Sequence, residues 1–428
     1  MNIITHPDRS QYTTLLSRPH RDATDLNDTV SKVLADVRHN GDEAIRRYEQ
    51  QFDKVQLDAL AISPDEMAEA ETLVSPELRE AIRQAHDNIA RFHQAQQMTP
   101  VHVETQPGVE CWQKSVAIER VGLYIPGGTA PLFSTVLMLA TPAKIAGCQD
   151  IILCSPPNRE GRLHPAILVA AGIAGVNRIY KIGGVQAIGA MAYGTESVPK
   201  VSKIFGPGNQ FVMCAKQQVS LGDVAIDMPA GPSEVAIVAD DTCNPTFVAA
   251  DLLSQAEHGA DSQSILFTDS PRVAQAVSTE VARQLALLPR QEMAAQAIEH
   301  SKIIVLDTID EAFDICNEYA PEHLILAMDD AHEYTSRIVN AGSVFIGHYS
   351  CESAGDYASG TNHTLPTSGY AKAYSGVNLD SFCRKITFQH LTAEGVKSIG
   401  RTVELMAQAE SLDAHKQAMT YRIEALQK

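Results

Sequence analysis

One segment places two possible metal ligands three residues apart at the end of a helix. The stretch NPTFVAADLLSQAEHG starts with Asn244, a good N-cap, has Pro245 at the first helical position and stops at Gly259. Gln255 and His258 therefore project from the same face of its last turn, where they could share a metal ion. An isolated pair with this spacing is more often a surface glutamine beside a histidine that binds the terminal carbonyls, so the spacing alone is weak support.

Two further side chains could complete such a site. Asp356 lies in SAGDYASGTNH, where small residues leave room for a ligand, and His415 lies in ESLDAHKQ within a C-terminal helical stretch. Taken singly, Asp356 is typical of a turn cap and His415 of an exposed helical residue. Together with Gln255 and His258 they would form a mixed nitrogen and oxygen set that suits zinc and leaves positions open for a substrate.

Glu322 and His323 are adjacent in YAPEHL and could transfer protons. Neighbouring residues do not point at one atom in a helix or a strand, so we expect the pair to serve two separate proton-transfer steps. The alternative interpretation is a glutamate in a first helical turn after Pro321, beside a partly buried histidine.

Three glycine turns, at residues 124–128, 183–186 and 206–209, could approach a nucleotide. Two of them directly follow expected strands, where the backbone of an open α/β sheet meets its ligands. None matches G-x-G-x-x-G, so a tight turn without a ligand is the alternative for each. Cys154, at a strand end, is a candidate aldehyde-trapping nucleophile. Because no activating base lies near it in sequence, a buried, inert thiol is the favoured interpretation.

These groups are spread over 428 residues, enough for two or three compact units. Short β-branched runs alternate with Ala-rich segments of helical length, which indicates an α/β fold with a largely parallel sheet. The expected strands are 151–154, 178–182, 203–205, 234–238, 264–267 and 302–306. Helical spacing is also present in residues 29–52, with a break at Gly41, in 77–92 and in 393–428.

Charge and composition exclude some classes of partner. The 34 Lys and Arg against 52 Asp and Glu give a net charge of -18, which disfavours nucleic acid and anionic membrane surfaces. Eight cysteines without a CxxC pair indicate a reducing compartment, and the N-terminus lacks an export signal, so we expect a cytoplasmic protein. Residues 121–143 carry no charge, but their prolines and glycines favour a buried turn and a core helix over a membrane span.

Longer strings of the chain resemble the histidinol dehydrogenase family nearly end to end. They are VGLYIPGGTAPLFSTVLMLATPA, ESVPKVSKIFGPGN, AIDMPAGPSEV, DLLSQAEHG, PEHLI, ESAGDYASGTNHTLPT and LDAHK. The resemblance implies the last step of histidine biosynthesis, in which two successive NAD-dependent oxidations convert L-histidinol to L-histidine through a bound aldehyde. It also implies one zinc ion per subunit.

The same resemblance implies roles for single residues. Proton transfer falls on Glu322 and on His323, which we expect to be a neutral base near pH 7. The implied zinc ligands are Gln255, His258, Asp356 and His415. The implied substrate contacts are Ser233, Gln255, His258, His323, Asp356, Glu410 and His415. The implied NAD contacts are Tyr124, Gln186 and Asn209.

The resemblance further implies two nucleotide-binding-like domains of incomplete Rossmann type, with mostly parallel sheets and small helical segments at both ends. The expected division is an N-terminal arm (1–20), a larger α/β domain (21–123 and 235–377), a smaller NAD-binding-like domain (124–234) and a C-terminal helical segment (378–428). In a homodimer the last segment would reach the partner and bring Glu410 and His415 into a shared active site.

Two alternatives to this function remain open. A zinc hydrolase would use the same ligands, take Glu322 as the base that activates water, and need no NAD. A related dehydrogenase would oxidise another amino alcohol or a polyol, because pocket contacts set specificity.

Overall fold

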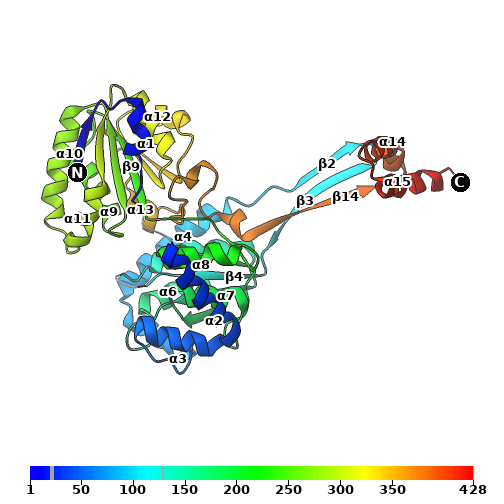
Figure 1. Cartoon of the computed structure of the whole chain (residues 1–428), viewed down its shortest axis with the longest axis horizontal. Helices are drawn as coiled ribbons and strands as arrows, with labels where there is room; N and C mark the ends of the chain where they lie inside the picture. Colours follow the sequence, from blue (N-terminus) through cyan, green and yellow to red (C-terminus); the bar gives the residue numbers. More distant parts are fainter. Residues whose placement is uncertain (20–23, 128–129, 428) are drawn as a thin grey trace.

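The chain folds into two α/β units and a projecting arm (Figure 1), and the computed structural model describes residues 1–19, 24–127 and 130–427. The first unit is built on a parallel sheet of six strands in the order β1-β11-β10-β9-β12-β13. These strands are β1 (Asn2–Thr5), β9 (Glu234–Ala239), β10 (Gln263–Thr268), β11 (Lys302–Val305), β12 (His323–Ala327) and β13 (Ser343–Ile346). We call this part the six-stranded unit.

Helices cover both faces of the six-stranded sheet. One face packs against α9 (Pro245–Ala256), α10 (Pro271–Leu285) and α11 (Gln291–His300). The other face packs against α1 (Tyr12–Leu15) and α12 (Ile309–Tyr319). Because both faces are covered, β9, β10 and β12 are buried along their whole length, and β9 and β12 are apolar along nearly all of it, as expected of strands inside a parallel sheet.

The second unit is built on a parallel sheet of five strands in the order β6-β5-β4-β7-β8. These strands are β4 (Arg120–Tyr124), β5 (Asp150–Ser155), β6 (Arg178–Lys181), β7 (Lys203–Phe205) and β8 (Ala225–Ile226). One face carries α3 (Pro64–Leu73), α4 (Pro76–Gln94), α5 (Phe133–Ala146) and α6 (Pro165–Ala174). The other carries α2 (Thr24–Tyr48), α7 (Gly184–Tyr193) and α8 (Gln210–Ser220).

The packing of α2, α3 and α4 differs from the expected domain division, which grouped residues 21–123 with 235–377. These helices bury their apolar faces on the five-stranded sheet. The Ile62 N–H donates to the Ile179 carbonyl oxygen and the Lys181 N–H donates to the Leu60 carbonyl oxygen, which joins residues 60–62 to β6. Helical periodicity shows that a helix has a buried face but not which sheet covers it. That assignment of residues 24–123 is therefore corrected.

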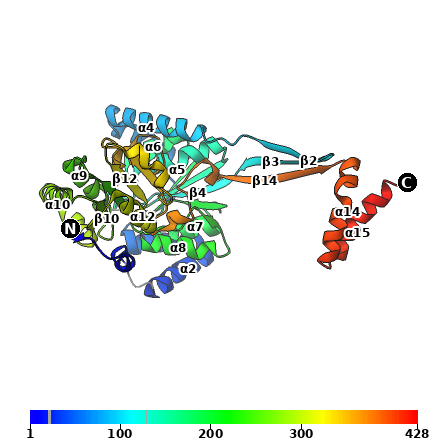
Figure 2. The ribbon, with the colours of Figure 1, turned by 90° about the horizontal axis from the view of Figure 1, so that it is seen from above.

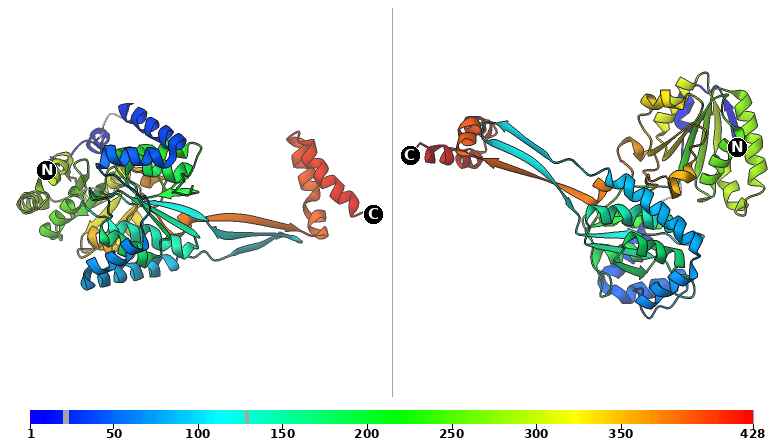
Figure 3. Two further views of the ribbon diagram at one scale, coloured as in Figure 1. Left: turned by 90° about the horizontal axis from the view of Figure 1, so that it is seen from below. Right: turned by 180° about the vertical axis from the view of Figure 1, so that it is seen from behind.

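The arm is an antiparallel sheet that ends in two helices. Its strands are β2 (Val101–Gln106), β3 (Val109–Ala117) and β14 (Cys383–Leu391), in the order β14-β3-β2. It carries α14 (Ala393–Ala409) and α15 (Asp413–Ala425) far from both α/β units (Figures 1 to 3). The C-terminal stretch is helical as predicted, but its tether to β3 was not expected.

Most local predictions are confirmed. All six expected strands are present, and the α/β class with mostly parallel sheets holds. Asn244 caps α9 by accepting a hydrogen bond from the Thr246 N–H, and Gly41 interrupts α2 with a non-helical backbone. The uncharged stretch from residue 121 forms β4 and the buried helix α5; residues 128 and 129 of its turn lie outside the described residues. Among the described residues, no helix has the length and apolarity to cross a bilayer.

Candidate active site

The expected catalytic residues lie at the amino end of the six-stranded sheet. Parallel strands begin at the same edge, and β9 begins at Glu234 while its neighbour β12 begins at His323, so Ser233 and Glu322 directly precede adjacent strands. The Glu234 N–H donates to Oε2 of Glu322 at 3.0 Å, which ties the two strand starts together. Short loops before two central strands therefore position these groups.

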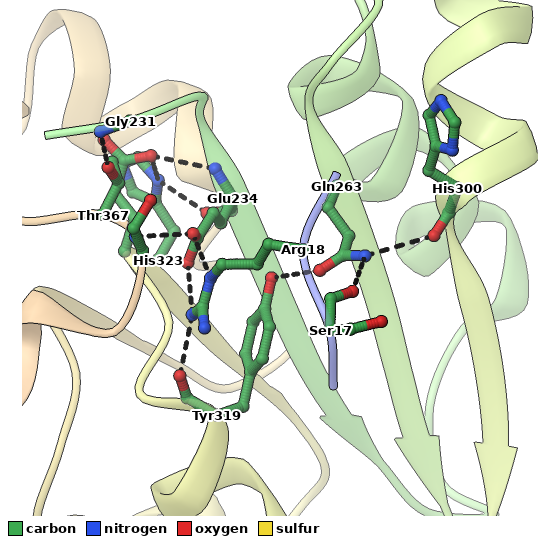
Figure 4. Close-up of polar contacts among 11 residues, drawn as sticks. Ser17, Arg18, Gly231, Glu234, Gln263, His300, Tyr319, His323 and Thr367 are labelled. Carbon is green, nitrogen blue, oxygen red and sulfur yellow. Dashed lines mark hydrogen bonds and ion pairs between the residues drawn. The ribbon is translucent and has the colours of Figure 1, made fainter. Parts of the chain in front are cut away.

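Glu322 and His323 face each other instead of pointing apart. Oε2 of Glu322 lies 3.7 Å from Nδ1 of His323, and the same nitrogen lies 3.4 Å from the Glu234 carbonyl oxygen (Figure 4). Glu322 directly precedes β12, so the alternation of side chains along a strand does not separate it from His323, and the two separate proton-transfer steps stay a prediction. Both side chains are buried.

A cluster of ligand atoms lies next to this pair. His258, Glu352 and Asp356 each place one nitrogen or carboxylate oxygen within 4.8 Å of the others. Glu352 and Asp356 come from the short helix α13 (Glu352–Tyr357), and His258 follows α9. Oδ1 of Asp356 is buried, lies 3.5 Å from Nε2 of His323 and has no hydrogen-bond partner. The cluster thus presents a buried carboxylate oxygen without a hydrogen-bond partner, and Nε2 of His323 beside it is a buried nitrogen without one.

Gln255 also points into this cluster. With its amide in the orientation that satisfies both neighbours, Nε2 donates to the Glu352 carboxylate and Oε1 accepts from the Glu234 N–H at 2.9 Å. The helix α9 ends at Ala256, so His258 leaves the helix in a turn instead of continuing the same helical face. The structure therefore brings together Gln255, His258 and Asp356, three of the four expected ligands.

The fourth expected ligand lies elsewhere in the chain. His415 belongs to α15 and Glu410 directly follows α14, both at the far end of the arm, and both are exposed (Figures 1 and 2). Ser411, with φ of 59°, breaks the helical stretch between them. Within one chain these two residues do not join the cluster.

Glu352 was missed by the sequence analysis, although a signal was present. It precedes Asp356 by four residues, a spacing that puts both carboxylates on one face of a helix. Oε1 of Glu352 lies 3.9 Å from Nδ1 of His323. Burial raises its pKa well above the ordinary value, and the surrounding carboxylates add to this rise.

Carboxylates dominate the electrostatics of the site. Burial raises the pKa of Glu322 to about 7, against the opposing effects of His323 and of the Glu234 N–H. Burial would lower the pKa of His323, but Glu352, Glu322 and Asp356 outweigh it and raise that pKa to about 10. The three carboxylates therefore favour the protonated form of His323 when no cation is bound beside them, and the neutral imidazole stays an expectation for the metal-bound site. A bound cation would stabilise the buried carboxylates of the cluster.

The three glycine turns meet at the carboxyl end of the five-stranded sheet. The hydroxyl of Tyr124 accepts from the Gly184 N–H at 3.1 Å, which joins the first turn to the second. A Cβ on Gly206 would lie 2.1 Å from the Tyr124 carbonyl oxygen, so only glycine fits where the third turn crosses the first. Gln186 is buried, and Asn209 is exposed and caps α8. Gly128 of the first turn lies outside the described residues.

Cys154 does not behave as a nucleophile. It is fully buried, and burial raises the pKa of its thiol well above the ordinary value. The interpretation as an inert thiol holds.

Comparison with known proteins connects this site to a reaction class. The family model described as histidinol dehydrogenase matches residues 16–423. The histidinol dehydrogenase of Bacteroides thetaiotaomicron is 60% identical over 426 residues, covering 100% of both chains. The chain belongs to the histidinol dehydrogenase family. The relative from Salmonella typhimurium is 52% identical over 419 residues, covering 97% of this chain and 96% of the relative.

Solved structures agree with this membership. The crystal structure of histidinol dehydrogenase from Elizabethkingia anophelis has a TM-score of 0.98 and 53% identity, covering 100% of this chain and 99% of that chain. An acetylating aldehyde dehydrogenase from Geobacillus thermoglucosidasius has a TM-score of 0.50 and 12% identity, covering 90% of this chain and 94% of that chain, which shows a shared fold alone. Membership in a dehydrogenase family makes the chain an oxidoreductase and sets aside the zinc hydrolase alternative.

Proposed function

We propose that this enzyme catalyses the four-electron oxidation of L-histidinol to L-histidine with zinc and NAD, the last step of histidine biosynthesis. The relatives named histidinol dehydrogenase support the substrate. One structural observation carries the proposal: the Glu322–His323 pair lies against the ligand cluster of Gln255, His258 and Asp356. A base beside a metal-ligand set is the arrangement that oxidation of a small amino alcohol requires.

The residues present fit zinc. His258 offers a ring nitrogen and Asp356 a buried oxygen without a hydrogen-bond partner, and the buried carboxylates around them call for a cation. Gln255, His258 and Asp356 would hold one ion per subunit, and a fourth ligand, His415, would come from another chain. When bound, zinc supplies positive charge and open positions that hold nitrogen atoms of the substrate.

The proton transfers belong to His323 and Glu322. His323 would accept the proton of the substrate alcohol, a role that requires the neutral imidazole. Positive charge beside Glu352 and Asp356 would counter the raised pKa of His323, because those carboxylates cause it. Glu322, whose pKa of about 7 lets it exchange protons near neutrality, then activates the water that hydrates the bound aldehyde.

The glycine turns would hold NAD, which would supply the acceptor for both hydrides. Carboxyl ends of parallel strands are the usual ligand-binding edge of an open α/β sheet, and the turns there can approach a dinucleotide closely. Tyr124, Gln186 and Asn209 are the proposed contacts. Ser233, beside Glu322 at the start of β9, is a proposed substrate contact.

We further propose a homodimer with shared active sites, because the arm has apolar surface that the described part of its own chain leaves exposed. Its exposed apolar side chains include Val101, Val103, Ile386, Phe388, Leu405, Met406 and Leu412. Burying them against a second copy would place the partner's Glu410 and the partner's His415 in the site, as a substrate contact and a zinc ligand.

Sharing is tested by mixing two inactive variants. His415→Ala and Gln255→Ala chains are each expected to be inactive, whereas mixed dimers contain one site whose members are all intact. Activity should recover toward half of the wild-type activity per mixed dimer. Complete absence of recovery, with mixed dimers demonstrated by differential tagging, contradicts sharing.

The activity is tested by a steady-state assay of the purified chain with L-histidinol and NAD, after chelation and after zinc is restored. We expect chelation to abolish activity, zinc to restore it, and about two reduced NAD to form per histidine. Faster oxidation of another amino alcohol or of a polyol would favour the alternative substrate.

We place the enzyme in the cytoplasm. All eight cysteines are free in the structure, which suits a reducing compartment. The net charge of -18 makes a nucleic acid or an anionic membrane an unsuitable partner.

A further inference from the structure

The N-terminal segment, residues 1–18, passes the starts of β11, β10 and β9, at the end of the sheet where the candidate site lies. The strand β1 pairs with β11, and the segment after α1 is held by Gln263, whose Nε2 donates to the Ser17 carbonyl oxygen at 3.1 Å. Lys302 donates to the Leu15 carbonyl oxygen at 2.6 Å. Arg18 comes next and points toward the start of β9 (Figure 4). Arg18 thus lies beside the proposed catalytic residues.

Arg18 binds Glu234 with two parallel hydrogen bonds. Nε donates to Oε1 of Glu234 at 2.5 Å and Nη2 donates to Oε2 at 2.9 Å, the fork geometry in which arginine binds carboxylates most strongly. Nη2 also donates to the Tyr319 carbonyl oxygen at 2.8 Å, and the guanidinium carbon lies 4.1 Å from the centre of the Tyr319 ring. Four contacts from two partners fix this guanidinium.

The guanidinium of Arg18 stabilises the carboxylate of Glu234. Its carboxylate is buried, and Arg18 is the one basic side chain that pairs with it in the described part of the chain. Burial raises the pKa of Glu234 in spite of Arg18. A carboxylate at this depth that lost the forked contact with Arg18 would be unpaired and would move toward water.

The peptide groups of Glu234 in turn hold the proposed catalytic residues. Its N–H lies 3.0 Å from Oε2 of Glu322 and, in the satisfied amide orientation, 2.9 Å from Oε1 of Gln255. Its carbonyl oxygen lies 3.4 Å from Nδ1 of His323. Its carboxylate also accepts from the Ser368 N–H at 2.6 Å. One residue therefore contacts both proton-transfer groups and one proposed zinc ligand.

We propose that Arg18 is a positioning residue of the reaction, which acts through Glu234 to hold Glu322, His323 and Gln255 in place. This inference rests on the proposed function, since it assumes that Glu322 and His323 transfer the protons. Lysine would not replace the arginine fully, because an ammonium group cannot bind both carboxylate oxygens and the Tyr319 carbonyl with the same planar fork.

The test compares Arg18→Ala and Arg18→Lys with Arg9→Ala, a control on an exposed arginine of the same N-terminal segment. We expect Arg18→Ala to lower kcat about 10- to 100-fold while the KM for NAD changes less than about twofold, as is typical when a supporting contact behind a reactive group is lost. Arg18→Lys should recover part of the loss. Methylguanidinium chloride should restore activity to Arg18→Ala, whereas sodium chloride at equal ionic strength should not.

Two outcomes would overturn the inference. In the first, Arg18→Ala keeps kcat within about twofold of the wild type. In the second, kcat, the KM for NAD and the melting temperature all worsen together without rescue by methylguanidinium, which marks a general loss of structure. A wild-type chain inactive with histidinol would instead refute the proposed function. The crystal structure of Arg18→Ala would then decide the inference, which predicts loss of the contact between the Glu234 N–H and Glu322.

Discussion

Replacing Glu49 with glutamine should stabilise the second unit, which is built on the five-stranded sheet, at neutral pH but not at acidic pH. Glu49 is fully buried in the π-helical turn Glu49–Asp53, where Oε1 accepts from the Gly183 N–H and from Nε2 of Gln186, both at 2.9 Å. Burial raises its pKa from 4.5 to about 7, and Asp53 adds to the rise. A glutamine keeps one acceptor oxygen for both donors and carries no charge.

The magnitude follows from the raised pKa. Because the unfolded chain ionises near 4.5 and the folded chain only near 7, the free-energy cost is absent below about 4.5, grows as the pH rises, and is complete above about 7. At about 1.4 kcal/mol per pKa unit, this rise corresponds to roughly 3 kcal/mol. We therefore expect Glu49→Gln to be more stable than wild type by roughly 2–3 kcal/mol at pH 8 and equal to it near pH 4.5.

The assay is urea unfolding at a series of pH values, followed by hydrogen exchange of amides in α7, which reports on this unit. Glu43→Gln is the matched control, since Glu43 lies six residues earlier, in α2, and is exposed. The control should follow the wild-type pH dependence. Parallel stability curves for wild type and Glu49→Gln from pH 4.5 to 8 would refute the reasoning.

Three further changes test other contacts. Lys216→Met leaves the buried Asp227 without the cation that lies 2.6 Å from it, so unfolding in urea should show a loss of about 3–5 kcal/mol; a loss below about 1 kcal/mol would contradict this. Gly206→Ala forces a methyl group against the Tyr124 carbonyl, so the KM for NAD should rise about tenfold or more; an unchanged KM would remove this turn from the cofactor site. Glu352→Gln removes a carboxylate from the ligand cluster, so competition with a chelator should show zinc affinity about 10- to 100-fold weaker; equal affinity would mean that Glu352 does not support the metal.

The sequence predicted the α/β units well because their strands are buried on both faces and therefore stand out as continuous apolar runs. The strands β9 and β11 are of this kind. The arm was missed for the opposite reason. All of β2 and most of β14 are exposed on both faces, and their apolar alternation is limited to Val101 with Val103 and Ile386 with Phe388, too short to indicate a strand. The pairing of β14 with β3 puts Leu391 opposite Val109, 282 residues away, which no local pattern encodes.

Site residues could be proposed from the sequence where their type and local spacing indicate a chemical role. Contacts between residues far apart in the sequence could not. Gln255 and His258 were found from the helix signals around them. The link of Arg18 to Glu234 spans 216 residues and leaves no local trace. The charge of His323 also depends on three carboxylates, two of which lie in α13, so its protonation could not be inferred from the segment YAPEHL.

The position of the metal tests the central claim most directly. Anomalous diffraction at the zinc edge, from crystals of the dimer grown with zinc, should show one peak per chain at about 2.0–2.2 Å from Gln255, His258, Asp356 and the partner's His415. A zinc peak elsewhere, or none at these residues in a fully loaded and active enzyme, would contradict the proposed site.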